Sequence, residues 1–467
     1  MIQPQFQLKR YLVALATFFL LVSCKSPSVY TEQDFPCKLE TNISSVSSSS
    51  PLEIALHVDG SGSMLGYVDN PNSRYIQTLD LLDSIFLGQG SRDQVTLSYY
   101  RSGGLKNQQL NRQQYRNAFN PDFYTGTNPT FPKVSSQLDK AITPPAKTDK
   151  LLVFVTDLEQ NGGDVNNLVD TIEKNFFKDK HNQYSVGILA IKSEFNGTIY
   201  TTEPRVYSDF YYNTKGEKID QYRPFYVVFI APYSDLVYYY EAMKNQAKDL
   251  IESSQLVIFS PNTFIKESGY PKLSTPLPNE ISNPQSLQIG RVAFESSQSN
   301  SGQSSYTLLE IPKRIDQKEL SIPFTLPFSP TDYTLLPEPE KIKTETTIKA
   351  SNSFEKKFLP QNNNASLKQA LEIKDLKLTD NQFTFTTAIQ PESFSEPGIY
   401  LFTIDLRVEN LQDASWWKDW DWESRTNSED GSKTYNLLNF MRNLKTRMTD
   451  GETKPAISRF CYAIQKN

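Results

Sequence analysis

The chain has 467 residues, with 48 lysines and arginines against 53 aspartates and glutamates and a formal net charge of −5. This length suits two folded domains, and the lack of a basic excess excludes an obvious nucleic-acid-binding protein. Only three cysteines and two histidines occur, which excludes a disulfide-dense scaffold, a four-cysteine zinc site and a histidine-rich metal centre.

The N-terminus has the pattern of a secretion signal. Lys9 and Arg10 precede an apolar run over residues 11–22. A membrane-spanning helix needs about 20 apolar residues, so this run is too short to span a bilayer and suits the core of a signal peptide. We therefore expect residues 1–23 to be absent from the mature chain.

The end of this segment carries a lipid-attachment pattern. Residues 21–24 are Leu-Val-Ser-Cys, which resembles the lipobox of bacterial lipoproteins. The resemblance implies that Cys24 becomes the lipidated first residue and anchors the chain in a membrane of the cell envelope. Lys25 stands where that family has an aspartate for inner-membrane retention, which favours the outer membrane in a cell with two membranes. The alternative is an ordinary secretory signal with Cys24 incidental.

Residues 24–50 are rich in serine and predict a flexible tether between the anchor and the folded chain. Cys37 lies within this tether, and with Cys24 lipidated the remaining cysteine is Cys461. In an oxidising compartment two such thiols can form a disulfide, which would join the tether to the C-terminus. Two free thiols are the alternative, and the sequence leaves both open.

Between residues 51 and 265 short apolar runs alternate with longer amphipathic ones. They predict strands at 52–58, 95–100, 151–155, 186–191, 226–230 and 256–259, and helices at 75–86, 134–142, 165–177 and 234–251. This alternation predicts an α/β domain with a mainly parallel sheet and helices on both faces. Residues 195–223 break the alternation and predict an inserted hairpin rich in tyrosine.

The pattern changes after a boundary at residues 261–285, which hold five prolines. Further strands are predicted at 288–294, 307–311, 344–349, 383–389 and 399–408, and a helix at 434–447. We expect residues 280–467 to form a β-rich, sandwich-like domain with one late helix. All four tryptophans lie within residues 416–422, where packing is favoured over a sugar- or protein-binding surface.

A cluster of hydroxyl and acidic side chains follows two of the predicted strands. Asp59, Ser61 and Ser63 form an Asp-x-Ser-x-Ser motif directly after the first strand, and Asp157 follows the third. Thr127 lies in a polar loop between them. Ligand sites of α/β sheets form at the carboxyl ends of the strands, which favours a site here over a glycine- and serine-rich turn with a capping aspartate.

The motif, its order and its spacing resemble the metal-ion-dependent adhesion site of von Willebrand factor type A domains, which have a Rossmann-like sheet. The resemblance implies that Ser61, Ser63 and Thr127 bind a divalent ion directly, while Asp59 and Asp157 act through water or outer contacts. Hard oxygen donors of this kind suit Mg²⁺, with Mn²⁺ and Ca²⁺ as alternatives. A protein partner is then expected to supply an acidic side chain to the open position of the ion.

The resemblance extends over residues 51–265 and departs from the family in three places. Leu158 stands where many members have glycine. Thr125 and Thr130 lie close enough to compete with Thr127 for the role of loop ligand. The tyrosine-rich insertion is not a usual part of the family, so the partner specificity of its members cannot be transferred.

These observations predict a membrane-anchored extracytoplasmic binding or adhesion protein that recognises a protein partner through a divalent ion and catalyses no reaction. Two alternatives stay open. One is a metal-dependent hydrolase, for which only acids such as Glu159 or Asp164 could serve as general base. The other is a structural protein of the cell envelope with a vestigial site. His57 lies within the first strand and is expected to be a core residue.

Overall fold

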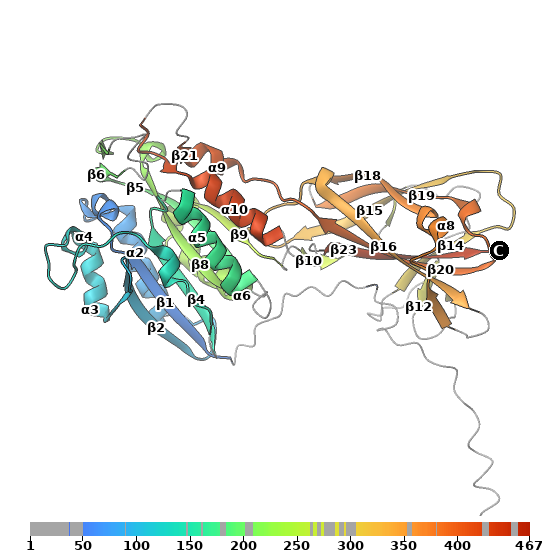
Figure 1. Cartoon of the computed structure of the whole chain (residues 1–467), viewed down its shortest axis with the longest axis horizontal. Helices are drawn as coiled ribbons and strands as arrows, with labels where there is room; N and C mark the ends of the chain where they lie inside the picture. The colour runs from blue at the N-terminus through green and yellow to red at the C-terminus, as the bar shows by residue number, and fades with distance from the viewer. Residues whose placement is uncertain are drawn as a thin grey trace, which may run out of the picture.

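Figure 1 shows the computed structural model of the chain. It describes residue 37 and residues 50–467 except for the segments 89, 146–147, 160–161, 178–183, 201–208, 262–264, 269–271, 275–284, 289–293, 296–304, 353–356, 380, 423–428 and 450–455. The predicted signal peptide, Cys24 and most of the tether lie outside the described residues. Within the described part of the chain, no helix is both long and apolar enough to cross a membrane.

A seven-stranded sheet forms the centre of the α/β region, in the order β3-β2-β1-β4-β8-β5-β9. β1 pairs in parallel with β2 and β4, whereas β8 is antiparallel to β4 and β5, and the outer strands β3 and β9 are antiparallel to their neighbours. The sheet is therefore mixed, and the prediction of a mainly parallel sheet is wrong. Its strands are β1 (Leu52–Asp59), β2 (Val95–Ser102), β3 (Gln108–Leu110), β4 (Asp149–Thr156), β5 (Tyr184–Ser193), β8 (Arg223–Pro232) and β9 (Gln255–Phe259).

The direction of β8 follows from the chain that connects it to β5. That chain is the predicted insertion, and it forms a separate two-stranded hairpin of β6 (Asn196–Ile199) and β7 (Phe210–Asn213). Strands joined without a crossover helix pair antiparallel, so β8 lies beside β5 in the opposite direction. All ten residues of β8 are buried, and a strand buried on both faces has the same apolar pattern in either direction.

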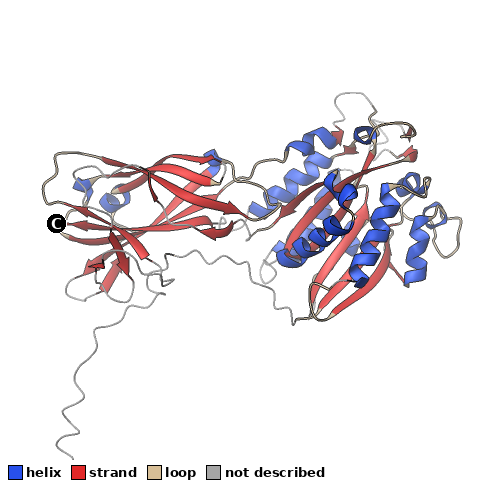
Figure 2. Ribbon diagram, turned by 180° about the vertical axis from the view of Figure 1, so that it is seen from behind, coloured by secondary structure: helices blue, strands red, loops and turns tan. Residues whose placement is uncertain are grey.

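Helices cover both faces of the sheet (Figure 2). One face packs against α2 (Arg74–Gly88), α3 (Arg112–Tyr115), α4 (Asp122–Thr125), α6 (Tyr233–Gln246) and α7 (Lys248–Glu252), and the other against α5 (Gly162–Ile172) and the π-helical turn Glu173–Phe177. The alternation of side chains along a strand divides β1 between the two layers. Leu56 and Val58 contact the first layer, and Ala55 contacts the second.

The helix predicted at residues 134–142 is reduced to the 3-10 turn Leu138–Ala141. Pro132 and Pro144 bracket this stretch, and proline disfavours helical backbone in the residue before it. The Ser135 carbonyl also accepts a hydrogen bond of 2.9 Å from the Gly104 amide. The prediction of a helix here is wrong, and the loop instead packs against the end of β2.

The C-terminal region is β-rich, as predicted, and consists mainly of two sheets. Phe385 in one sheet stacks on Phe460 in the other, and the ring of Phe324 contacts that of Tyr462 at a tilt of 52°, so the two sheets share an aromatic core. The first sheet contains β10 (Ile265–Ser268), β11 (Lys272–Leu273), β15 (Leu320–Pro330), β18 (Leu371–Thr379) and β19 (Gln382–Ile389). The second contains β12 (Gln285–Gln288), β13 (Phe294–Glu295), β14 (Ser305–Ile311), β16 (Ile342–Asn352), β17 (Lys357–Pro360), β20 (Gly398–Val408) and β23 (Ala456–Lys466), and the short helix α8 (Ala365–Gln369) lies between β17 and β18 in the chain.

Residues 409–455, here called the return segment, leave the second sheet after β20 and rejoin it at β23. They form α9 (Ser415–Trp420), β21 (Asp421–Trp422), β22 (Thr434–Tyr435) and α10 (Leu437–Thr449). In Figure 1 the red helices α9 and α10 lie beside α5 and β9. Trp417 stacks on Phe259 of β9, and Arg447 pairs with Asp170 of α5 at 2.9 Å. The late helix α10 and Trp417 of α9 therefore pack on the α/β region.

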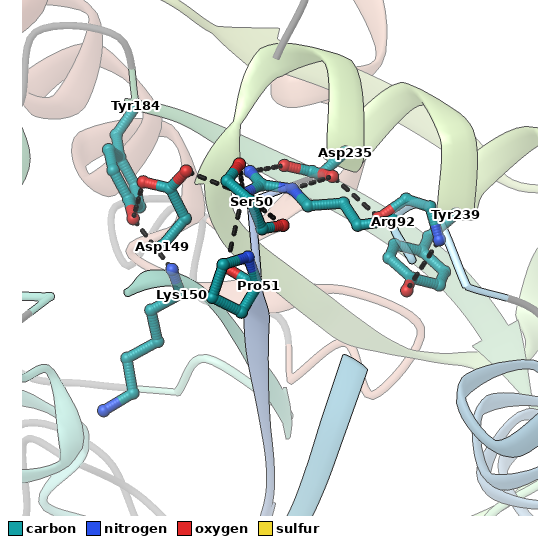
Figure 3. Close-up of polar contacts among 9 residues, drawn as sticks. Ser50, Pro51, Arg92, Asp149, Lys150, Tyr184, Asp235 and Tyr239 are labelled. Atoms are coloured by element: carbon teal, nitrogen blue, oxygen red, sulfur yellow. Dashed lines mark hydrogen bonds and ion pairs between the residues drawn. The ribbon is translucent and has the colours of Figure 1, made fainter. Parts of the chain in front are cut away.

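A buried arginine holds the start of the α/β region together (Figure 3). Arg92 pairs with Asp149 at 2.7 Å and with Asp235 at 2.5 Å. It also donates to the hydroxyl of Ser50 and, more weakly, to the Pro51 carbonyl. These contacts tie the entry of the chain to the first residue of β4 and the first turn of α6. They lie at the end of β4 opposite to the candidate site.

A disulfide joins Cys37 to Cys461 of β23, with the two Cα atoms 5.8 Å apart. Both cysteines are buried, and they pack with Leu308, Leu401 and Ala463. The tether is therefore fixed to the β-rich region at its middle. Only residues 38–49 connect this fixed point to the α/β region.

Candidate metal centre

The candidate site lies at one edge of the seven-stranded sheet, where three neighbouring strands end. Asp59 is the last residue of β1, Ser102 is the last of β2, and Asp157 follows the last residue of β4. Because these strands run parallel, their carboxyl ends meet at the same edge. The Asp-x-Ser-x-Ser motif then turns away from the sheet into the 3-10 helix η2 (Gly62–Val68).

The carboxylate of Asp59 is buried and accepts three hydrogen bonds. Its Oδ1 accepts from the Ser61 amide at 2.9 Å, and its Oδ2 accepts from the hydroxyls of Ser136 and Thr156, each at 2.9 Å. Only 1% of the residue is exposed. The three donors fix the carboxylate at the end of β1, with Oδ1 bonded to the motif itself and Oδ2 bonded to β4 and to the loop that precedes it.

The two serines of the motif lie together between the acids. Their hydroxyl oxygens are 3.0 Å apart, and the Ser63 hydroxyl also hydrogen-bonds the side chain of Asp157. The structure thus brings Asp59, Ser61, Ser63 and Asp157 into one hydrogen-bonded group. Its members come from two strand ends almost one hundred residues apart in the sequence.

Asp157 carries the most perturbed carboxyl of the site. Burial raises its pKa to about 7, with further raising by the negative charges of Glu159 and Asp59, while Arg223 and the Ser63 hydrogen bond oppose the shift. Its Oδ2 is buried and has no hydrogen-bond partner among the described residues. An added cation would lower the energy of this buried carboxylate, because opposite charge favours its ionised form.

Two buried arginines flank the group. Arg101 of β2 donates to the carbonyl oxygen of Gly60 at 3.1 Å, and a side chain at position 60 would overlap Arg101, so only glycine fits there. Arg223 of β8 lies 2.9 Å from Glu159 Oε1 and 4.0 Å from Asp157 Oδ2. Burial disfavours its charged form, but Glu159 and Asp157 raise the pKa of the guanidinium above its usual value.

The predicted loop ligand Thr127 is exposed, and its hydroxyl lies 2.7 Å from that of Thr125. Gly126 between them has a φ of 76°, which glycine adopts without strain. The Thr130 amide donates to the Asn128 side chain. The hydroxyls of Thr125 and Thr127 therefore hydrogen-bond each other, and the Thr130 carbonyl accepts a hydrogen bond from the Gln108 side chain of β3. The hydroxyl that reaches Asp59 from this part of the chain belongs to Ser136.

The donor set fits a hard divalent cation. Carboxylate and hydroxyl oxygens suit Mg²⁺, which keeps several waters and needs few protein ligands. In the described part of the chain, no three histidine, cysteine, aspartate or glutamate side chains are grouped as metal ligands, so a site that relies on carboxylates or imidazoles alone is not seen there. Asp157, Ser61 and Ser63 would hold the ion, and Asp59 would orient the serine loop.

Comparisons with protein-family models, curated proteins and solved structures find no match to this chain. The resemblance to von Willebrand factor type A domains therefore rests on the motif and on its position at the sheet edge.

The sequence pattern did not single out three residues of the site. Ser136 was predicted to lie in a helix, so nothing pointed to its contact with Asp59. Arg101 lies near the end of β2 and Arg223 is the first residue of β8, and only a positive charge at the end of a strand could have marked them. His57 is a core residue as predicted, since it is 4% exposed and shares a hydrogen bond of 2.9 Å with Ser102.

Proposed function

We propose that the chain is an extracytoplasmic binding protein, anchored to a membrane through a lipid on Cys24, that recognises a protein partner through a divalent cation. The cation, Mg²⁺ in the first place, binds at the edge formed by β1 and β4. The partner supplies an acidic side chain to the open position of the ion. Recognition involves no chemical turnover.

The observation that carries the proposal is the buried Asp157 Oδ2, which has no hydrogen-bond partner among the described residues. It belongs to the same group as the paired hydroxyls of Ser61 and Ser63. A buried carboxylate oxygen without a hydrogen-bond partner is costly, and a cation with hydroxyl ligands beside it would offset that cost. Such an ion has few carboxylate ligands, so it attracts an acidic side chain from outside.

Two further observations support the binding role and the compartment. Glu159, one of the two acids that a hydrolase could use as general base, is held by the guanidinium of Arg223 at 2.9 Å. A carboxylate in a buried ion pair is poorly placed to accept a proton from water. The disulfide between Cys37 and Cys461 is typical of proteins outside the cytosol.

Thermal unfolding of the mature chain in millimolar Mg²⁺ and in chelator tests the metal step. A ligand that binds only the folded state stabilises it, by about 2.7 kcal/mol at one hundred times Kd. We expect a higher midpoint in Mg²⁺ for the wild type and a reduced gain for Ser63→Ala. An equal midpoint in both buffers for the wild type would contradict the proposal.

The partner step needs a second measurement. The immobilised mature chain is exposed to surface proteins of its own cell, in Mg²⁺ and in chelator, beside the Ser63→Ala variant. We expect a retained protein that is released by chelator and is absent with the variant. Retention that is the same in both buffers would show that recognition does not use the ion.

A further inference from the structure

Arg223 is a fully buried cation at the margin of the candidate metal site. Its side chain is 1% exposed, and its guanidinium lies 5.1 Å from the centre of the Phe195 ring. On one side it faces Glu159 and Asp157, at 2.9 and 4.0 Å. It reaches this position because β8 lies directly beside β4 in the sheet.

The other side of Arg223 faces the return segment. Its Nη1 donates long hydrogen bonds to the carbonyl oxygens of Gly431 and Lys433, at 3.4 and 3.5 Å. Its Nε has no hydrogen-bond partner in the described part of the chain. The guanidinium is thus incompletely satisfied by neutral groups, and its strongest partners are the two carboxylates of the site.

We infer that Arg223 is a built-in counter-cation that pairs with Glu159 and competes with the divalent ion for Asp157, and that it thereby lowers the affinity of the site for metal. This inference rests on the proposed function, because it concerns the same ion. A guanidinium keeps its charge in proteins. It therefore offsets part of the negative charge of the acids in the absence of metal and repels a second cation that approaches them.

The consequence is a site that is stable without metal and binds it only weakly. A buried pair of acids with no counter-charge would destabilise the fold, and the same pair would bind a divalent cation more strongly. Arg223 therefore lowers the affinity of the site for metal and raises the stability of the metal-free fold. A site of this kind responds to changes in the concentration of the ion outside the cytosol, because it is not saturated at trace levels.

The test uses the mature full-length chain and Mg²⁺ or Mn²⁺ alone as the probe, with calorimetric titration and thermal unfolding. Arg223→Gln removes the charge and keeps much of the volume, and Arg223→Lys keeps the charge. Arg459→Gln is the control for the loss of an arginine charge away from the site, because Arg459, whose side chain is 22% exposed, pairs with Asp405 in the β-rich region at 2.6 Å. We expect Arg223→Gln to bind the ion about ten-fold or more tightly than the wild type, and Arg223→Lys and Arg459→Gln to bind like the wild type.

The outcomes separate this inference from the proposed function. If the wild type binds the ion and Arg223→Gln binds it equally or more weakly, the inference is wrong and the metal site stands. If only Arg223→Gln binds the ion, Arg223 occupies the place of the metal in the wild type, which supports the inference and contradicts the proposed function. If neither binds, both fail.

Arg223→Gln also provides a folding test, because loss of the guanidinium leaves two buried acids without their counter-charge. Where the variant is unfolded in chelator, added Mg²⁺ or Mn²⁺ should restore the folded state, since the ion then replaces the missing charge. A variant that stays unfolded in the presence of the ion would overturn the inference.

Discussion

The Ser136 hydroxyl lies 2.9 Å from Asp59 Oδ2, although 77 positions separate the two residues in the sequence. It is one of three donors to a carboxylate that is almost fully buried. The carboxylate of Asp59 therefore supports the fold as well as the candidate site. Asp59 is thus buried although it is the last residue of its strand.

The first prediction concerns the stability of the Asp59→Ala variant. In chelator its free energy of unfolding should fall by about 2–3 kcal/mol, because three donors, two of them in the buried residues Ser61 and Thr156, lose their acceptor. Ser136→Ala, which removes one donor, should cost about 1 kcal/mol. Urea unfolding of the two variants and the wild type measures both effects. An Asp59→Ala variant as stable as the wild type would show that the three hydrogen bonds contribute nothing.

The second prediction concerns the disulfide between Cys37 and Cys461. Its reduction should lower the free energy of unfolding by about 2–5 kcal/mol, as for other native disulfides. Thermal unfolding with and without a reductant measures the change, and the Cys37→Ser variant should behave in both buffers like the reduced wild type. A wild type that is indifferent to reductant would contradict this prediction.

The third prediction follows from the burial of His57. Burial, together with the charge of Lys150, lowers its pKa to about 3, while the unfolded chain has the ordinary value near 6.5. Between these two values the unfolded state binds more protons, so stability falls as the pH decreases from about 6.5. The limiting slope from this residue is about 1.4 kcal/mol per pH unit.

The His57→Phe variant provides the comparison, because a phenyl ring can stack on Tyr100 and Phe154 as the imidazole does. Denaturant unfolding between pH 5 and 6.5, above the range where most carboxylates titrate, should show a smaller slope for the variant. Equal slopes for both proteins would mean that His57 does not titrate differently on unfolding.

The fourth prediction concerns the anchor. Cys24→Ser should move the protein out of the membrane fraction or leave it unprocessed, because a bound lipid contributes about 0.8 kcal/mol per buried CH₂ group. Membrane fractionation and the mass of the mature chain measure the result. Fractionation and mass like those of the wild type would contradict lipidation at this residue.

Much of the α/β region can be predicted from the sequence because its strands are short apolar runs. β1 and β4 follow from their patterns, and the position of Asp59 and Asp157 after them follows in turn. The direction of β8 could not be predicted, because its burial on both faces leaves no alternation to indicate a neighbour. The contact of Ser136 with Asp59 depends on a loop whose prolines prevent the predicted helix.

The sequence pattern also could not predict where the late helix packs. The sequence of α10 indicates an amphipathic helix but not the surface that its apolar face covers. That surface is α5 and β9, on the far side of the boundary at residues 261–285. Contacts between residues so far apart in the sequence depend on how the two regions pack together. The local sequence of residues 434–447 does not determine this packing.

Calorimetric titration of Mg²⁺ or Mn²⁺ into the mature chain tests the central claim most directly. The Asp157→Asn variant removes the carboxylate whose Oδ2 has no hydrogen-bond partner among the described residues, and Asp405→Asn is a control that changes a buried carboxylate in the β-rich region. We predict saturable binding at one site in the wild type and in Asp405→Asn, and binding at least ten-fold weaker in Asp157→Asn. The absence of saturable binding in the wild type, or equal binding in Asp157→Asn, would contradict the account.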